Sequence, residues 1–143
     1  MSSLIKVEVS QIQNKLVPIL KSHEQIAGAY LFGSALEACR PDSDIDVGLI
    51  MMPDHNISEK EFDLIEARIL KDLSPLATHH FDLVFLNHQD AFFSHKVIKY
   101  GKLIYVRDMD VITDFTELVS IKYREEYPRY RQALETIALG GSK

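Results

Sequence analysis

The 143-residue sequence has one cysteine, no tryptophan and no long hydrophobic segment. Cys39 has no second cysteine with which to form an internal disulfide. No stretch approaches the roughly 20 consecutive apolar residues that a membrane-spanning helix needs. The amino terminus has neither the basic start nor the apolar run of a signal peptide. We therefore expect a cytoplasmic protein that is not embedded in a membrane.

Positive charge is also scarce. Sixteen Lys and Arg residues stand against 21 Asp and Glu residues, which gives a formal net charge of −5. Because no broad cationic field is available to hold a phosphate backbone, we expect no direct binding of nucleic acid. The length and the 46% of hydrophobic residues fit one globular domain. We expect a single domain over residues 1–143, with a C-terminal helical segment at about 111–139.

Hydrophobic periodicity predicts that helices and strands alternate along the chain. Four segments have the spacing of helices, and they cover about residues 5–21, 58–74, 90–100 and 111–139. Ser58 followed by Glu61 is a capping box, which predicts the start of the second helix. Four short apolar runs have the length of buried strands, at residues 26–32, 46–52, 81–86 and 102–106. This order favours an α/β (α+β) fold, a mixed sheet with helices packed mainly on one face. Pro128 should break or kink the last helix.

The most informative segment is residues 31–50, which reads LFGSALEACRPDSDIDVGLI. A predicted strand ends at Gly33 and Ser34, and Asp44 and Asp46 open the next strand. Residues two apart in a strand point to the same face, so the two carboxylates should lie side by side. Such a pair is unfavourable without a cation, because ionised carboxylates a few ångströms apart repel one another.

The chemistry of these residues indicates a magnesium and nucleotide site. Mg²⁺ prefers oxygen ligands and usually takes one or two carboxylates, several waters and the phosphates of a substrate. Gly33 leaves room for backbone N–H groups to approach a phosphate, and the Ser34 hydroxyl can donate to a phosphate oxygen. The segment therefore predicts a triphosphate cradle beside a metal site at Asp44 and Asp46.

The Gly-Ser pair followed after nine residues by Asp-X-Asp resembles the signature of the polymerase beta-like nucleotidyltransferases. More closely, the chain is similar over roughly residues 25–130 to the minimal nucleotidyltransferases encoded beside HEPN-domain proteins, the MntA-type antitoxins. The resemblance rests on Phe-Gly-Ser at residues 32–34, on Pro-Asp-Ser-Asp-Ile-Asp at 41–46, on Phe-Asp-Leu-Val-Phe-Leu at 81–86 and on Tyr-Gly-Lys-Leu-Ile-Tyr at 100–105.

The resemblance implies a role for each matching residue. It places Gly33 and Ser34 in the nucleotide-binding motif and Asp44 and Asp46 in the metal-binding pair. It makes Asp82 the third catalytic carboxylate, which helps to bind metal and activates the attacking hydroxyl. The loop after Ser34 departs from the family pattern, because it reads Ala-Leu-Glu-Ala-Cys-Arg and is one residue shorter.

The resemblance also implies a Mg²⁺-dependent transfer of a nucleoside monophosphate to a hydroxyl acceptor. The expected reaction is transfer of AMP from ATP to a tyrosine of a HEPN-domain toxin, within a homo- or hetero-oligomer, so that the chain acts as an antitoxin and protein adenylyltransferase. Two alternatives stay open at this point. One is nucleotidyl transfer to a small molecule such as an aminoglycoside, and the other is an antitoxin that binds its toxin without catalysis.

Other polar and aromatic residues have simpler interpretations. Three lysines at positions 96, 99 and 102 are expected to form a solvated face, with contact to the triphosphate as the alternative. Tyr123, Tyr127 and Tyr130 should pack against the sheet, with a partner-facing surface as the alternative. The histidines at positions 79, 80, 88 and 95 lack the spacing typical of a zinc site, and Cys39 lacks the partners of a nucleophile.

Overall fold

The computed structural model describes residues 8–33, 44–53, 58–73 and 80–139. Its elements follow the predicted order. They are α1 (Val9–Lys21), β1 (Ile26–Phe32), β2 (Ile45–Met51), α2 (Glu59–Asp72), β3 (Phe81–Phe85), the 3₁₀ turn η2 (Leu86–His88), α3 (Ala91–Tyr100), β4 (Lys102–Val106) and α4 (Met109–Ala138). β1 and β4 have the predicted bounds, and the other described elements start or end within a few residues of them. No helix in the described segments is long and apolar enough to cross a membrane.

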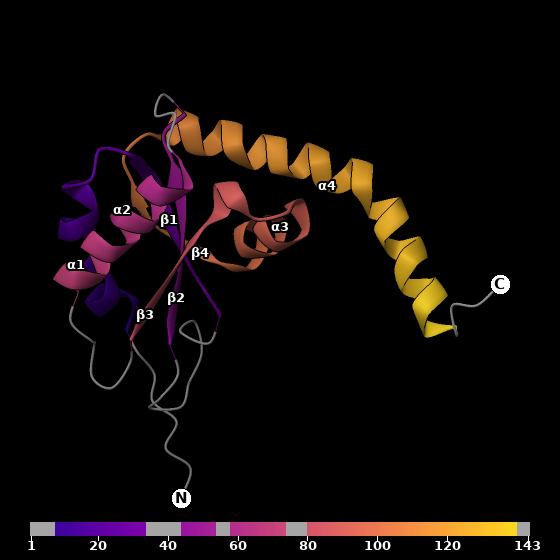
Figure 1. Cartoon of the computed structure of the whole chain (residues 1–143), viewed down its shortest axis with the longest axis horizontal. Coiled ribbons are helices and arrows are strands. Elements are labelled where there is room, and N and C mark those ends of the chain that lie inside the picture. Colours follow the sequence, from indigo (N-terminus) through magenta and orange to yellow (C-terminus); the bar gives the residue numbers. More distant parts are fainter. Residues whose placement is uncertain (1–7, 34–43, 54–57, 74–79, 140–143) are drawn as a thin grey trace, which may run out of the picture.

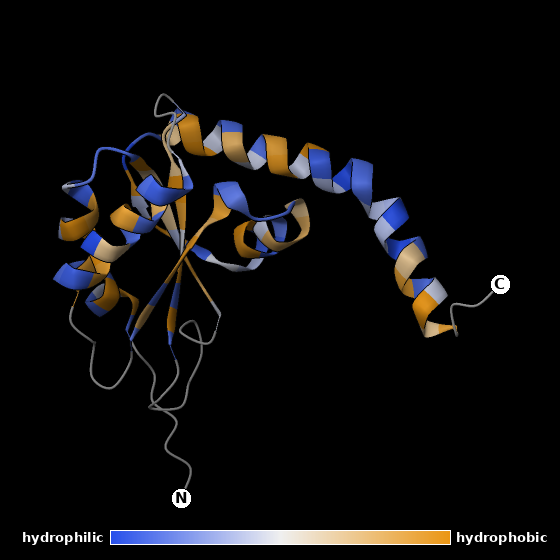
Figure 2. Cartoon of the chain, in the orientation of Figure 1, coloured by the Kyte–Doolittle hydropathy of each residue, from blue (hydrophilic) through white to orange (hydrophobic). Residues whose placement is uncertain are grey.

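The four strands form one mixed sheet with the order β3-β2-β1-β4. β1 pairs antiparallel with both β2 and β4, whereas β2 and β3 run parallel. The parallel pair starts in a fixed register, because the Ile45 N–H donates to the carbonyl oxygen of His80 over 2.7 Å. The sheet therefore brings the first residues of β2 and β3 to the same edge, where Figure 2 shows the strands change from hydrophobic to hydrophilic.

Helices cover both faces of the sheet, which corrects the prediction that they pack mainly on one face. α1 and α2 lie on one side and α3 and the start of α4 on the other (Figure 1). Each side has its own buried cluster, one with Leu16 and Ile69 and the other with Val97 and Ile112. The reason is visible in β1 and β2, which are buried at nearly every position. A strand with two buried faces needs apolar cover on both.

Local signals position the helices as the sequence predicts. The Ser58 side chain caps α2 by accepting a hydrogen bond from the Glu61 N–H at 3.3 Å. Asp90 caps α3 in the same way through the Phe93 N–H at 2.8 Å. The buried hydroxyl of Ser94 donates to the carbonyl oxygen of Leu86 at 3.1 Å. The Ser94 hydrogen bond attaches α3 to η2, which directly follows β3.

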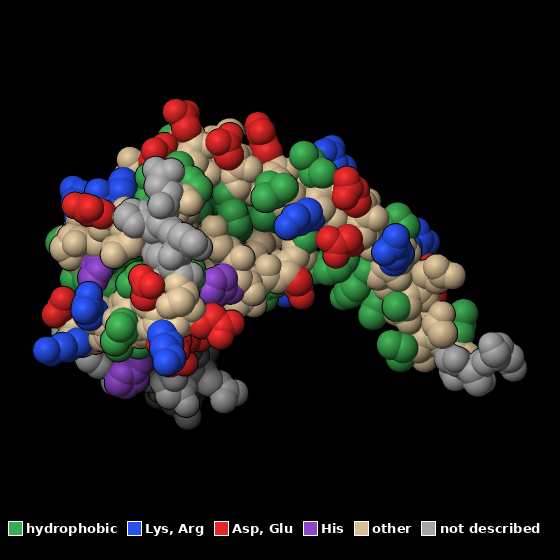
Figure 3. All heavy atoms as spheres, turned by 45° about the horizontal axis from the view of Figure 1, so that its top comes forward, with side chains coloured by type: hydrophobic (Ala, Val, Ile, Leu, Met, Phe, Trp, Pro, Cys, Tyr) green, Lys and Arg blue, Asp and Glu red, His purple; other side chains and the backbone are tan. Residues whose placement is uncertain are grey.

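α4 continues through Pro128 without a break, and Figure 1 shows that it bends in its C-terminal half. After Val119 the helix leaves the sheet, so Tyr123 and Tyr130 do not pack there as expected. Tyr123 instead stacks on His95 of α3 with ring centroids 3.8 Å apart, and Tyr130 stacks on Phe92 at 4.2 Å. Beyond this contact, apolar side chains stay at the surface (Figure 3), including Ile137 at 74% exposure.

Gly101 forms the tight connection between α3 and β4. A Cβ atom at this position would collide with the Val97 carbonyl oxygen and lie 2.8 Å from the carbonyl oxygen of Leu31. Both are backbone atoms, so neither can turn away. The absence of a side chain at residue 101 therefore lets α3 end close against β1.

We predict that Gly101→Ala lowers the free energy of unfolding by about 1–3 kcal/mol, the usual scale of overpacking. Urea denaturation measures this change, with Lys102→Ala at the exposed neighbouring position as the control. A loss no larger than that of the control would contradict the close packing of this turn.

Candidate functional site

Three aspartates predicted from the sequence meet at one edge of the sheet. Asp46 lies in β2 and Asp82 in β3, and the two residues are direct partners in the parallel pairing. Paired residues of neighbouring strands project to the same face, so their carboxylates are neighbours. Asp44 precedes β2 by one residue and is exposed. Its negative charge acts on Asp46, so the two carboxylates are close enough to interact.

Asp46 is the most enclosed of the three. Its carboxyl is partly buried. Burial raises the pKa of Asp46 above its ordinary value, and the negative charges of Asp82 and Asp44 raise it further. The acidic field extends to α2, where burial and the charges of Asp63 and Asp82 raise the pKa of Glu66. This edge of the sheet thus concentrates negative charge in a way that a cation would relieve.

Gly33 closes the site on its other side. It follows β1 with φ at 74°, a left-handed conformation that favours glycine. A Cβ atom on Gly33 would collide with the Asp46 carboxylate oxygen Oδ2. The end of β1 and the start of β2 are therefore in contact through backbone and carboxylate. Ser34, the other predicted nucleotide-binding residue, lies outside the described residues.

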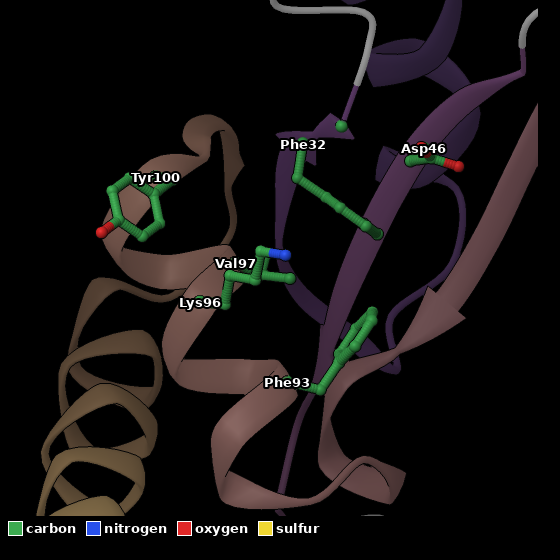
Figure 4. A pocket seen from close by; sticks show the side chains of 7 residues that line it. Phe32, Asp46, Phe93, Lys96, Val97 and Tyr100 are labelled. Carbon is green, nitrogen blue, oxygen red and sulfur yellow. The ribbon is translucent and has the colours of Figure 1, made fainter. Parts of the chain in front are cut away.

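A cleft of about 440 Å³ opens beside these residues, within the roughly 300–1,000 Å³ of small-molecule sites. Figure 4 shows Asp46 on one side and residues of α3 on the other. Phe32 of β1 and Phe93 of α3 are in edge-to-face contact, with ring centroids 5.7 Å apart. The residues that line the cleft are Phe32, Gly33, Asp46, Phe93, Lys96, Val97 and Tyr100.

The α3 side of this cleft was not identified from the sequence. Lys96, expected with Lys99 and Lys102 on a solvated face or else in contact with the triphosphate, is exposed and also lines the cleft. Lys99 lies over the Tyr100 ring at 5.3 Å, and Lys102 is exposed on β4. Helical spacing could have separated these lysines, because Phe93, Lys96, Val97 and Tyr100 are three, four and seven residues apart on one helix face.

The side chains of this site offer the oxygen ligands that Mg²⁺ prefers. All three aspartates offer carboxylate oxygens, and Mg²⁺ completes its shell with water and substrate phosphates. In the described part of the chain, no three His, Cys, Asp or Glu side chains form a preformed metal cage. Asp44, Asp46 and Asp82 are thus no closed protein cage, and a Mg²⁺ ion held there would need further oxygen ligands from water or a substrate phosphate.

Two histidines considered for zinc binding have aromatic partners instead. The His88 ring packs on Phe62 with centroids 3.9 Å apart, and His95 stacks on Tyr123. His79 and Cys39 lie outside the described residues.

Solved structures with the same fold include toxin–antitoxin proteins. A chain of a toxin–antitoxin structure with AMP-PNP is 16% identical, with a TM-score of 0.66, over 88% of this chain and 98% of that one. A chain from a tri-AMPylated Shewanella oneidensis HEPN toxin in complex with MNT antitoxin is 15% identical, with a TM-score of 0.67, over 92% and 99%. A chain of a MntA–HepT toxin–antitoxin is 18% identical, with a TM-score of 0.57, over 90% and 95%.

Sequence comparison identifies the family. Comparison with curated proteins gives no significant match. The model of the polymerase beta nucleotidyltransferase domain matches residues 14–110, which include Gly33 and all three aspartates. Because this match covers more than half of the chain, the protein belongs to the polymerase beta nucleotidyltransferase family.

Proposed function

We propose that this chain is a Mg²⁺-dependent protein adenylyltransferase that transfers AMP from ATP to a tyrosine of a HEPN-domain toxin, and so acts as an antitoxin. The observation that carries the proposal is the contact between the Gly33 turn and the Asp46 carboxylate, with Asp82 in register beside it. Family membership supports nucleotidyl transfer as the reaction. The solved complexes of the same fold, one with AMP-PNP and one with an AMPylated HEPN toxin, support the donor and the acceptor.

In this proposal Asp44, Asp46 and Asp82 would hold Mg²⁺. The metal would neutralise charge on the triphosphate and polarise the α-phosphoryl group. Gly33 and Ser34 would hold the phosphates through backbone N–H groups and the serine hydroxyl. These groups would fix the α-phosphorus in line between the attacking oxygen and the leaving pyrophosphate.

Asp82 would be the general base of the transfer. It is exposed and stands beside the partly buried Asp46, so an incoming hydroxyl can reach it. The tyrosine oxygen of the acceptor would give its proton to Asp82 and form a bond to the α-phosphorus. The bond from the α-phosphorus to the oxygen bridging to the β-phosphate would break, and pyrophosphate would leave.

Transfer of label tests the reaction directly. The purified chain is incubated with Mg²⁺, ATP labelled at the α-phosphate and a HEPN-domain protein encoded by an adjacent gene. We expect label on a tyrosine of the partner, located by mass spectrometry. The double variant Asp44→Asn with Asp46→Asn should transfer at least about a hundredfold more slowly, since it loses groups that hold charge at the reacting phosphate.

Asp114→Asn is the matched control for that experiment, because it removes one exposed carboxylate from α4, away from the cleft. An unlabelled partner, with the chain folded and Mg²⁺ present, would contradict the proposal. Toxin neutralisation that survives in the double variant would instead indicate an antitoxin that acts by binding alone.

The burial of Asp46, together with the nearby charges of Asp82 and Asp44, predicts a pH-dependent effect on stability. Because the pKa of Asp46 is raised in the folded chain, the folded state binds more protons than the unfolded state just above the ordinary carboxyl pKa. Ionisation of Asp46 therefore opposes folding, and the stability that its protonated form contributes is lost as the pH rises through the raised pKa.

Without divalent metal, we expect Asp46→Asn to raise Tm at pH 7 and to have less effect near pH 4, about the ordinary pKa of a carboxyl. Addition of Mg²⁺ with ATP should raise the Tm of the natural chain more than that of the variant. Thermal melts monitored by circular dichroism provide the measurement, and a lower Tm for Asp46→Asn at pH 7 would show that repulsion does not dominate at this residue.

A further inference from the structure

The side of the cleft formed by α3, the α3 wall, has a cation and aromatic rings. Metal binding at the three aspartates does not explain these residues. Phe93, Lys96, Val97 and Tyr100 occupy one face of α3, and this face lies opposite Asp46 (Figure 4). Among the described residues that line the cleft, Lys96 is the only cation. Tyr100 is 67% exposed.

From this arrangement we infer that α3 is the wall that binds the donor nucleotide: Lys96 contacts the phosphates, and Tyr100 stacks on the nucleobase, so that the donor is a purine nucleoside triphosphate. The inference rests on the proposed function, because it concerns the donor of the same site. It adds two binding residues to those at the edge of the sheet.

The position of Lys96 fits contact with phosphate. Figure 4 shows its amino group directed into the cleft, on the side opposite the Asp46 carboxylate. A triphosphate between them would meet a metal held by carboxylates on one side and an ammonium group on the other. Without such a cation, the acidic edge of the sheet would repel the polyanion wherever metal did not cover it.

The position of Tyr100 fits contact with a nucleobase. Tyr100 is one turn beyond Lys96 on the same helix face, at the end of the cleft away from Asp46 (Figure 4). Its exposed ring offers a stacking surface, and Lys99 lies 5.3 Å from the ring centroid. Stacking on one aromatic residue contributes roughly 1–3 kcal/mol per base, and the two fused rings of a purine cover more of the tyrosine ring than a pyrimidine does.

The same lining predicts how the base is selected. The described cleft residues include no amide or small hydroxyl side chain that would read the edge of a base. Stacking area rather than hydrogen bonding should then decide the affinity. We expect the affinities for ATP and GTP to differ by less than about tenfold, and both nucleotides to bind more tightly than UTP.

Calorimetric titration of the full chain with Mg²⁺ and a non-hydrolysable ATP analogue tests the inference without any partner. Lys96→Met should weaken binding by roughly tenfold or more, the scale of a charge-assisted hydrogen bond, and Lys96→Arg should restore most of it. Lys60→Met is the matched control, since Lys60 is an exposed lysine at the start of α2 on the opposite face of the sheet. Tyr100→Ala should weaken binding by about fivefold or more, and Tyr100→Phe should leave it unchanged.

The outcomes separate this inference from the proposed function. If the natural chain takes up no nucleotide with Mg²⁺, both are wrong. If it binds and transfers AMP while Lys96→Met and Tyr100→Ala bind as the Lys60→Met control does, only the inferred α3 wall is wrong. A preference for ATP over GTP of more than tenfold would likewise overturn selection of the base by stacking alone.

Discussion

The burial of one carboxylate beside two others at one edge of the sheet is the constraint on which the candidate site depends. The parallel register of β2 and β3 places Asp82 directly beside Asp46, and burial of Asp46 makes its ionised form unfavourable. The fold does not separate these charges, since the backbone hydrogen bond from Ile45 to His80 fixes the two strand starts together. These unfavourable charges lower the stability of the metal-free chain, and a bound cation would raise it again.

The sheet order explains how distant parts of the sequence meet at this edge. β2 lies between β1 and β3, so the turn at Gly33 contacts Asp46 from one side while Asp82 adjoins it from the other. The second face of the sheet supplies the remaining wall. α3 reaches it because Gly101 permits a close turn and because Phe93 packs on Phe32. The cleft is thus a product of the two-sided fold, not of one motif.

Local features of the fold were predictable from the sequence, and features that depend on packing were not. Ser58 and Glu61 predicted the start of α2, and the apolar run before Gly33 predicted β1, because caps and strand ends depend on neighbouring residues. Spacing alone also predicted that Asp44 and Asp46 lie side by side, and in the structure Asp46 is in β2 while Asp44 precedes that strand by one residue. The adjacency of Asp82 to Asp46 followed only from the resemblance, since the order of strands in a sheet leaves no mark in residue spacing.

The errors have a common cause. Continuous apolar runs in β1 and β2 indicate burial but do not show that helices cover both faces, and the helices were therefore expected mainly on one. Tyr123 packs on α3 and not on the sheet because of where α3 lies, which hydrophobic periodicity does not predict. Solved structures that are only 15–18% identical to this chain have the same fold, so the same packing arrangement forms although most of the residues differ.

The central claim is that the aspartates and the Gly33 turn together bind a divalent ion and a triphosphate. Paramagnetic broadening of backbone amide resonances by Mn²⁺, with and without a non-hydrolysable ATP analogue, tests this most directly. The account predicts that Gly33, Asp46 and Asp82 broaden first, and at lower Mn²⁺ concentrations when the nucleotide is present. Broadening that begins elsewhere in the chain, or that does not respond to the nucleotide, would contradict it.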